Sequence, residues 1–440
     1  MKKVKIVTAV LAVLIISLSC QTLNNFSSDS QSEETPAPPI STATIKVDTP
    51  TPSVEAGSVA YVENGDVWLS GPDGTQKRKL ATGTGGGFSR VVWSPNGRTL
   101  LLIEKVGQGS AQRLFIKDLS EKPAKKVADE VFLFAWAPDG EKIAYYSDQI
   151  HILNVTTEQE EVTITVKSPT HLFWNLGGKA LLYYSRSEAG IRSVDISTLE
   201  ETGVYSPGET QKFSELDYSP LNGYFLAWLY ASEGGGTTAL ITPGGDLVEL
   251  VEEISGEPTA DWSSDGKYVV YKAWWEFASE DAVDYMHVVK ADTAKIVFAI
   301  PEKGINPRWS PDSRFIAYTT QKGGINLINF ETQEITSLLS DAPDAYLEER
   351  CGFGGFCGGF FATKDNKPDW SPDGQKIIQQ YKTGFYIVDV ATADSEWFEG
   401  GLSPDWMPSS GGAVVSPQAA TASIRLLNTK ASQNQRSWRR

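Results

Sequence analysis

The stretch Trp309-Ser-Pro-Asp-Ser-Arg-Phe-Ile-Ala-Tyr318 decides the fold of this chain, because it recurs along the sequence. Clear copies begin at Trp93, Trp136, Trp262 and Trp370, and weaker copies at Trp174, Tyr218 and Pro404. Successive repeat aromatics are 43, 38, 44, 44, 47, 61 and 36 residues apart. A period of about 40–45 residues is typical of a repeated unit of four β-strands.

Each copy has the composition of a β-hairpin followed by buried strands. The aromatic ends one strand, Pro sets φ for a type I turn, Asp or Asn can hydrogen-bond its own backbone, and Gly takes the left-handed position of a bulge. Runs that are apolar on both faces follow, as in Thr99 to Ile103 and Lys142 to Tyr146. Such runs are expected where sheets pack on both sides of a strand. Third strands and more polar fourth strands complete each unit.

The two ends of the array predict how it closes. Ser58 to Val62, Asp66 to Ser70 and Gln76 to Ala81 have the pattern of a second, third and fourth strand without a first. Leu402 to Met407 has the pattern of a first strand without the rest. Joined, they complete one blade from both termini and remove the exposed edges of an open array. We therefore predict an all-β fold, an eight-bladed β-propeller of four-stranded blades over residues 57–408.

The pattern Trp-Ser-Pro-Asp-Gly-x-x-Ile-Ala-Tyr is clearest at Trp309 to Tyr318 and Trp136 to Tyr145. It resembles the WD-repeat-like motif of TolB-type periplasmic proteins and of the propeller domains of prolyl-oligopeptidase-like enzymes. The resemblance covers about 350 of the 440 residues and implies a propeller scaffold, which does not define an activity. The chain departs from TolB in its lipid-anchor signal, its higher blade count and the absence of a preceding α/β domain.

The charge balance narrows the class of partner. Lys and Arg number 39 against 55 Asp and Glu, so the formal charge is -16. Binding phosphates relies on clustered Lys and Arg, so nucleic acid and anionic lipid surfaces are excluded as partners. Apolar residues at 40% and aromatic residues at 11% exclude global disorder.

The N-terminal segment predicts export. Three lysines among the first five residues precede an uncharged, mostly apolar run over residues 6–18, which is too short to span a bilayer. Ser17-Leu-Ser-Cys20 then resembles a bacterial lipoprotein cleavage box. We predict a signal peptide over residues 1–19 and a lipid anchor at Cys20 that holds the protein at the bacterial cell membrane or envelope. Plain secretion after Ser19, which would leave Cys20 as a free thiol, is the alternative.

The segments that flank the predicted propeller are polar. Residues 20–56 are rich in Ser, Thr, Pro and Glu, and such a composition cannot bury enough apolar surface to fold. We predict a disordered tether there and a disordered tail over residues 409–440.

The sequence offers little for catalysis. Prolyl-oligopeptidase-like enzymes carry their nucleophile on a Gly-x-Ser-x-Gly elbow, and no such pentapeptide occurs here. His151, His171 and His287 lie in or beside predicted strands, where a structural role is expected. No His-x-x-x-His or Cys-x-x-Cys predicts a zinc site. We predict no catalytic residue, no metal and no cofactor, and we reject peptidase activity of this chain alone.

Two insertions break the regular spacing. The first follows a second strand over residues 272–284, and the second follows a fourth strand over residues 341–361. Connections of these two kinds leave a blade on the same face, so both insertions should crowd one face. They either pack on the ring and plug its channel or form a binding surface, with the two Trp as stacking platforms and the acids as polar contacts. The candidate binding residues are Trp274, Trp275, Glu276, Phe277, Asp281, Phe353 and Phe356.

The cysteines divide into an anchor and a pair. Cys351 and Cys357 are predicted to form a disulfide, because export places them in an oxidising compartment and their spacing can be bridged. This pairing accounts for the odd number of cysteines if Cys20 carries lipid. The acidic first insertion could instead hold calcium, although its spacing matches no standard calcium loop.

The sequence thus favours a monomeric, non-catalytic propeller, anchored in the envelope, that binds a protein or glycan partner through one loop-rich face. The alternative from a different class is a carbohydrate-active enzyme, a polysaccharide lyase or glycosidase, that uses loop carboxylates. A third hypothesis is a sensor component that works with a separately encoded peptidase or transporter. A pair of carboxylates at catalytic separation would favour the enzyme.

Overall fold

The computed structural model describes residues 56–106, 112–188, 190–208, 211–231, 236–251, 259–272, 286–302, 304–320, 322–341 and 367–408. All of these residues belong to one compact unit. The secondary-structure elements within these ranges are all β-strands. No helix in the described part of the chain is long and apolar enough to cross a membrane.

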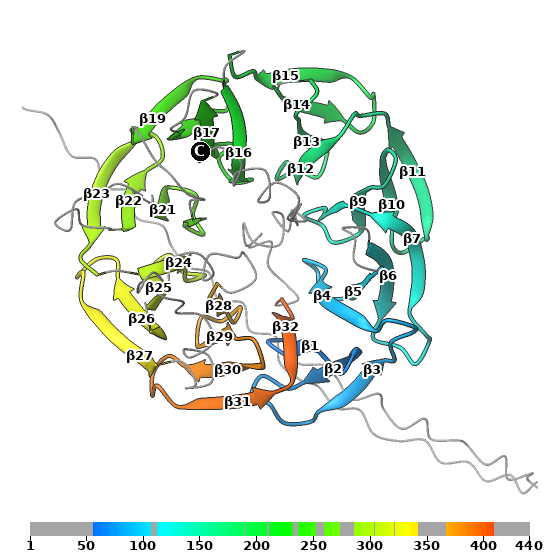
Figure 1. The fold of residues 1–440 in the computed structure, drawn as a ribbon, viewed down its shortest axis with the longest axis vertical. Helices are drawn as coiled ribbons and strands as arrows, with labels where there is room; N and C mark the ends of the chain where they lie inside the picture. The colour runs from blue at the N-terminus through cyan, green and yellow to red at the C-terminus, as the bar shows by residue number, and fades with distance from the viewer. Residues whose placement is uncertain are drawn as a thin grey trace, which may run out of the picture. The chain divides into compact units, whose positions relative to one another are not determined.

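The described strands form eight antiparallel four-stranded sheets, arranged as blades around one centre (Figure 1). We number blades 1 to 7 in chain order and call the eighth, which both ends of the chain build, the composite blade. The first, innermost strands are β4 Phe88–Trp93, β8 Leu133–Trp136, β12 Pro169–Trp174, β16 Gln211–Tyr218, β20 Thr259–Trp262, β24 Gly304–Trp309, β28 Asp369–Trp370 and, in the composite blade, β32 Gly401–Trp406. The second strands are β5 Thr99–Lys105, β9 Lys142–Tyr146, β13 Ala180–Ser185, β17 Phe225–Ala231, β21 Tyr268–Lys272, β25 Phe315–Thr320, β29 Lys376–Gln380 and β1 Val59–Glu63.

The third and fourth strands complete each blade toward the rim. The third strands are β6 Gln112–Asp118, β10 Ile150–Asn154, β14 Gly190–Asp195, β18 Gly236–Ile241, β22 Met286–Lys290, β26 Gly323–Asn329, β30 Gly384–Asp389 and β2 Asp66–Ser70. The fourth strands are β7 Lys125–Val131, β11 Gln159–Ile164, β15 Glu201–Tyr205, β19 Leu247–Val251, β23 Lys295–Ile300, β27 Ile335–Asp341, β31 Ser395–Glu399 and β3 Arg78–Ala81. The prediction of an all-β, eight-bladed propeller is confirmed.

The repeat motif forms the hairpin between the first and second strand of a blade. In blade 6, the Ser310 hydroxyl donates to Asp312 Oδ1 (2.6 Å) and accepts from the backbone N–H of Phe315 (2.9 Å). Asp312 Oδ1 also accepts from the backbone N–H of Arg314 (3.1 Å). The same Ser–Asp pairing recurs in blade 7. The Asp of the motif therefore holds the turn together, as the sequence predicts.

Neighbouring blades also interlock at this hairpin. The Asn96 side-chain amide of blade 1 donates to the carbonyl oxygen of Asp139 in blade 2 (3.0 Å). The next residue, Gly140, has a φ of +68°, and a Cβ added there would lie 2.8 Å from the backbone nitrogen of Asn96. Glycine is required at this position because it tolerates both the left-handed backbone and the close approach of the neighbouring blade.

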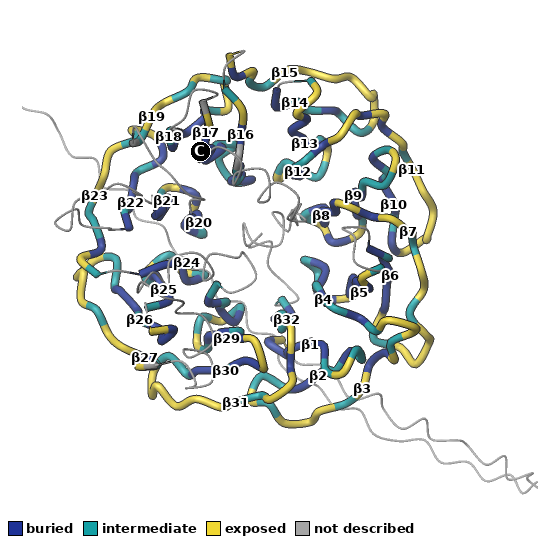
Figure 2. Tube along the Cα trace, in the orientation of Figure 1, coloured by how far each residue is buried: buried dark blue, intermediate teal, exposed yellow. Residues whose placement is uncertain are grey.

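The hydrophobic core is distributed over the interfaces between blades. Each buried apolar cluster of the described residues combines two neighbouring blades, as where Leu101 and Ile103 of blade 1 meet Trp136 and Tyr145 of blade 2. The inner strands are mostly buried, and the outer strands at the rim are largely exposed (Figure 2). This distribution explains why the inner runs are apolar on both faces whereas the fourth strands are polar.

The ring closes where β1 pairs with β32. Val59 lies opposite Trp406, and Ala60 lies opposite Asp405. The pairing extends beyond the strands, because the backbone N–H of Met407 donates to the carbonyl oxygen of Ser58 (2.7 Å). The predicted closure by strands from both ends of the chain is therefore correct, to within one or two residues at the strand ends.

Candidate functional site

The predicted loop and cysteine residues lie outside the described residues. They are Cys20, Trp274, Trp275, Glu276, Phe277, Asp281, Cys351, Phe353, Phe356 and Cys357. The proposed binding surface, disulfide and lipid anchor therefore stay predictions.

The described strands show from which face of the ring both insertions leave. β21 ends at Lys272, which pairs with Met286 at the start of β22, and β27 ends at Asp341. The second and the fourth strand of a blade run in the same direction, because each pairs antiparallel with the third strand. The chain therefore leaves both strands on the same face, from the adjacent blades 5 and 6.

A set of charged side chains lies on the innermost strands of this half of the ring. It occupies the position directly before the repeat aromatic. We call its members the charged arc: Asp217, Asp261, Arg308, Asp369 and Asp405, in blades 4 to 7 and the composite blade. We call the residues at the same position of blades 1 to 3 the apolar arc: Val92, Ala135 and Phe173.

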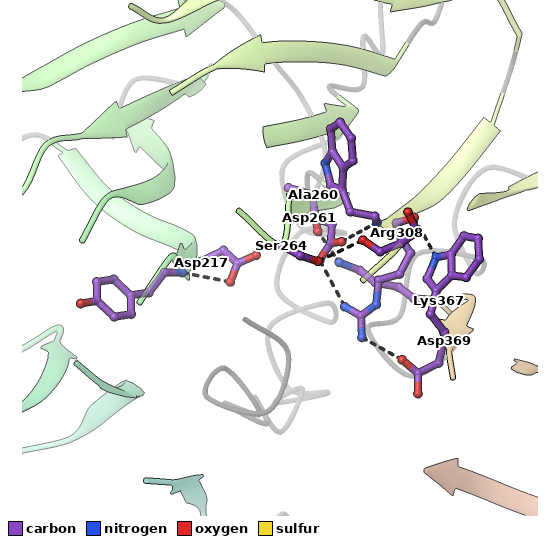
Figure 3. Close-up of polar contacts among 11 residues, drawn as sticks. Asp217, Ala260, Asp261, Ser264, Arg308, Lys367 and Asp369 are labelled. Atoms are coloured by element: carbon purple, nitrogen blue, oxygen red, sulfur yellow. Dashed lines mark hydrogen bonds and ion pairs between the residues drawn. The ribbon is translucent and has the colours of Figure 1, made fainter. Parts of the chain in front are cut away.

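Arg308 lies between two carboxylates of the charged arc (Figure 3). Its Nη1 is 3.3 Å from Asp261 Oδ1, and its Nη2 is 3.4 Å from Asp369 Oδ1. Lys367 adds a second cation, and its Nζ donates to the carbonyl oxygen of Ala260. Asp261 is only 5% exposed and the Arg308 side chain 18%, so these charges are largely removed from water. A buried ion pair of this kind persists only if each charge keeps its partner.

Members of the charged arc also join one blade to the next through the backbone. Asp261 Oδ2 accepts a hydrogen bond from the backbone N–H of Trp309 in the following blade (2.7 Å). Asp405 Oδ2 accepts from the backbone N–H of Trp93 in the same way (2.6 Å). The carbonyl oxygen of Arg308 accepts from the indole N–H of Trp370 (3.2 Å). The arc is therefore part of the contact between blades as well as a cluster of charges.

Burial governs the protonation of this cluster. Burial raises the pKa of Asp261 and of Asp369, and the charge of Arg308 opposes both shifts. Burial would lower the pKa of Arg308, but the charges of Asp261 and Asp369 outweigh it and the pKa is raised, so the guanidinium stays charged. Burial, followed by the charge of Asp369, raises the pKa of Asp405 to about 7. Asp405 is thus a carboxyl group that titrates near neutral pH.

All three histidines pack against aromatic rings. The ring centroids of His151 and Tyr145 are 5.0 Å apart, those of His171 and Phe173 are 6.0 Å apart, and those of His287 and Tyr271 are 5.8 Å apart. Burial lowers the pKa of His287. Within the described ranges, no group of three or more His, Cys, Asp or Glu side chains is arranged to hold a metal ion. The aromatic contacts of all three histidines fit the structural role that the sequence predicts for them.

Sequence reasoning does not single out the charged arc, although its pattern is visible in the sequence. Asp precedes the repeat Trp at residues 261, 369 and 405, and Arg precedes it at residue 308. Charged residues are seldom buried unless they are paired, so their recurrence beside a buried aromatic is a signal of a charged network. An alignment of the repeats shows this pattern of charged residues only if it includes the residue directly before the repeat aromatic.

No family model matches the sequence, and no curated protein matches it. Several solved structures have a similar fold. The dihydro-heme d1 dehydrogenase NirN, in a complex with DHE, aligns with a TM-score of 0.55 and 13% identity over 82% of this chain and 76% of that chain. A eukaryotic initiation factor aligns with a TM-score of 0.53 and 13% identity over 81% of this chain and 99% of that chain. TolB from Acinetobacter baumannii aligns with a TM-score of 0.36 and 13% identity over 70% and 82% of the two chains. At identities this low, the first two alignments show the β-propeller fold and no specific function.

Proposed function

We propose that the protein is a non-catalytic β-propeller that binds a protein or glycan partner in the cell envelope through the face that carries the insertions of blades 5 and 6. In this proposal, Cys20 anchors the mature chain to the membrane and residues 20–56 hold the ring away from it. The propeller acts as a rigid scaffold, and the insertions supply the recognition surface.

The length of the two connections carries the proposal. The second and third strands are joined by three residues in blade 2 and by two in blade 6, but by the 13 residues 273–285 in blade 5. Blade 5 is joined to blade 6 by three residues, whereas 27 residues join blade 6 to blade 7. The ring closes in the other blades without such segments, and long connections on a rigid scaffold are where binding residues concentrate.

The chemistry of the insertions favours an extended peptide or a glycan. Trp274, Trp275 and Phe277 offer flat apolar surfaces for stacking on sugar rings or on apolar side chains. Glu276 and Asp281 add hydrogen-bond acceptors that would orient a hydroxyl-rich or cationic ligand.

The test is binding by a variant with Trp274→Ala and Trp275→Ala. The partner is first identified with the wild-type protein, by capture from its own envelope or on a glycan array. The double variant should then bind this partner with an affinity at least about tenfold lower than that of the wild type. The controls are Leu176→Ala and Leu199→Ala, which change side chains that are 41% and 52% exposed on the opposite face. The proposal fails if the double variant binds like wild type, or if the two controls weaken binding equally.

One observation favours the carbohydrate-active enzyme as a second candidate. Asp405 has a pKa of about 7 and lies near a second carboxyl group, Asp369, which is the arrangement that a general acid needs. In this alternative Asp405, and not only a loop carboxylate, would donate a proton. Release of unsaturated or reducing sugar ends from a panel of polysaccharides, abolished by Asp405→Asn, would establish it. No release by the wild-type protein would reject it.

A further inference from the structure

The composite blade closes on blade 1 through one carboxyl group. β32 pairs with β1 along one edge only, as the innermost strand of its blade. Across the junction with blade 1, Asp405 Oδ2 accepts the backbone N–H of Trp93 at 2.6 Å. On the side of blade 7, the indole N–H of Trp406 donates to the carbonyl oxygen of Asp369 (3.1 Å). The contact between Asp405 and Trp93 therefore joins the last strand of the ring to blade 1.

Among the described strands, the same contact occurs once more, with different charges around it. Asp261 accepts the backbone N–H of Trp309 at 2.7 Å, and Arg308 lies 3.3 Å from the other carboxylate oxygen. Among the described residues, no cation forms an ion pair with Asp405. The two carboxyl groups therefore hold equivalent positions. Asp261 is in an ion pair, and Asp405 is in none that the described residues form.

The charged groups around Asp405 come from three strands. Asp369 on β28 opposes its ionisation, whereas Arg90 on β4 and Arg308 on β24 favour it with smaller effect. Arg308 is already paired with Asp261 and Asp369. On β1, the residue opposite Asp405 is Ala60, which adds no charge. Ionised Asp405 would thus stand beside a like charge in a partly buried position.

We propose that the closure of the ring is pH-sensitive, and that Asp405 at the junction of the composite blade with blade 1 is the group that senses pH. When Asp405 is protonated, it is neutral and is not repelled by Asp369. Its carbonyl oxygen still accepts a hydrogen bond from the Trp93 N–H. When Asp405 ionises, repulsion from Asp369 and the partial loss of hydration weaken the junction. β32 then opens more often from β4 and β28.

The direction of the effect on stability follows from proton linkage. The pKa of Asp405 is about 7 in the folded ring, against about 4 in an unfolded chain. The folded protein therefore binds more protons than the unfolded protein between these values. The stability that the protonated carboxyl contributes is complete below about pH 4 and is lost as the pH rises through about 7.

The test compares wild type with Asp405→Asn, whose side-chain oxygen can still accept the Trp93 N–H. The equilibrium constant for unfolding is measured with denaturant from pH 4 to pH 9. The ratio of the wild-type constant to that of the variant should rise by up to about tenfold per pH unit and level off above about pH 7. Hydrogen exchange of residues 401–406, corrected for its intrinsic pH dependence, should accelerate over the same range in the wild type only. Equal pH dependence in both proteins, in unfolding and in exchange, would overturn the proposal.

Two further variants keep the test decisive. Asp261→Asn changes the equivalent contact in blade 5 and should lower stability at every pH without removing the pH dependence. If Asp405→Asn does not fold, Asp369→Asn takes its place, because removing the like charge should move the transition to lower pH. An unmoved transition in that variant contradicts the proposal. Asp148 and Glu160 outweigh burial and raise the pKa of His151. His151 is present in every variant, so its contribution to the pH dependence cancels.

Discussion

The charged arc and the apolar arc occupy the same repeat position and have opposite chemistry. In blades 1 to 3 this position holds Val92, Ala135 and Phe173, and in the other five blades it holds an acid or Arg308. The hairpin that follows is built in the same way in both halves, with a Ser–Asn pair in blade 1 and a Ser–Asp pair in blade 6. Apolar clusters join neighbouring blades in both halves. The comparison teaches that the repeat specifies the blade, while one adjacent residue determines whether charges are added to the apolar packing between blades.

The charged arc also coincides with the long connections. Asp261 belongs to blade 5, where one insertion begins after β21. Arg308 belongs to blade 6, where the other insertion begins after β27. The apolar half has neither charges at this position nor insertions of that length in its described strands. We therefore expect the two halves to respond differently to substitution.

The largest effect is expected from Arg308→Met, which removes the cation shared by Asp261 and Asp369. Breaking a buried ion pair leaves uncompensated charge, so the free energy of unfolding should fall by about 3–5 kcal/mol. Denaturant unfolding at pH 7 measures it. Arg192→Met is the control, because the Arg192–Glu201 pair (2.9 Å) is 37% exposed on both sides and should cost less than about 1 kcal/mol.

A triple variant separates the loss of pairing from the loss of packing. Asp261→Asn, Arg308→Met and Asp369→Asn together remove the three charges that form the ion pairs, leave Lys367 in place, and keep the side-chain volumes similar. Stability should return to within about 2 kcal/mol of wild type. A triple variant as unstable as Arg308→Met alone would show that the charges are not the cause.

A smaller effect is expected when a carboxyl group is placed in the apolar arc. Ala135 is fully buried, so a carboxyl group placed there would be removed from water. Ala135→Asp should lower the free energy of unfolding by about 2–3 kcal/mol at pH 7. Because burial raises the pKa of such a group, the loss should increase between pH 5 and pH 8. Ala135→Val, which adds volume without charge, should show a loss that does not depend on pH.

The smallest effect tests the part that both halves share. Gly178 in blade 3 and Gly374 in blade 7 have φ values of +62° and +71°, and a Cβ on either would meet its nearest neighbour at 3.7 Å. Substitution of each by Ala should cost about 1 kcal/mol from the left-handed backbone alone. Gly140→Ala should cost about 1 kcal/mol more, because its Cβ would overlap Asn96. Thermal unfolding of the three variants measures these losses in stability. Unequal losses for the Gly178 and Gly374 variants would show that the stability of a hairpin depends on the arc to which its blade belongs.

The sequence was sufficient to predict the fold because each blade repeats one set of local rules. The turn at Ser310 to Asp312, the glycine at residue 140 and the buried repeat Trp each follow from short-range chemistry that recurs along the chain. The composite blade could be predicted because the strands before Trp93 lack a first strand and those after Trp370 end with one. Strand limits differ by one or two residues where a bulge shifts the register, as between Ala60 and Val62.

The charged arc could not be predicted in the same way, because it depends on distant parts of the chain. Arg308 reaches Asp261 and Asp369, which lie 47 and 61 residues away in the sequence. Asp405 contacts Trp93 across 312 residues. An isolated Asp-Trp pair in the sequence does not reveal which cation, if any, faces it. The aromatic residues of the insertions stand out by composition alone, and their role awaits the binding experiment.

The closure by β1 and β32 also has a consequence for how the chain is made. β1, β2 and β3 emerge first during synthesis, but the strand that covers β1 follows only after roughly 350 more residues, which at about 5–20 residues per second takes tens of seconds. Throughout that interval the apolar edge strand Val59–Glu63 has an unpaired side. A nascent chain with such an edge can pair with another chain, so the first blade to be synthesised is the last to be protected from aggregation.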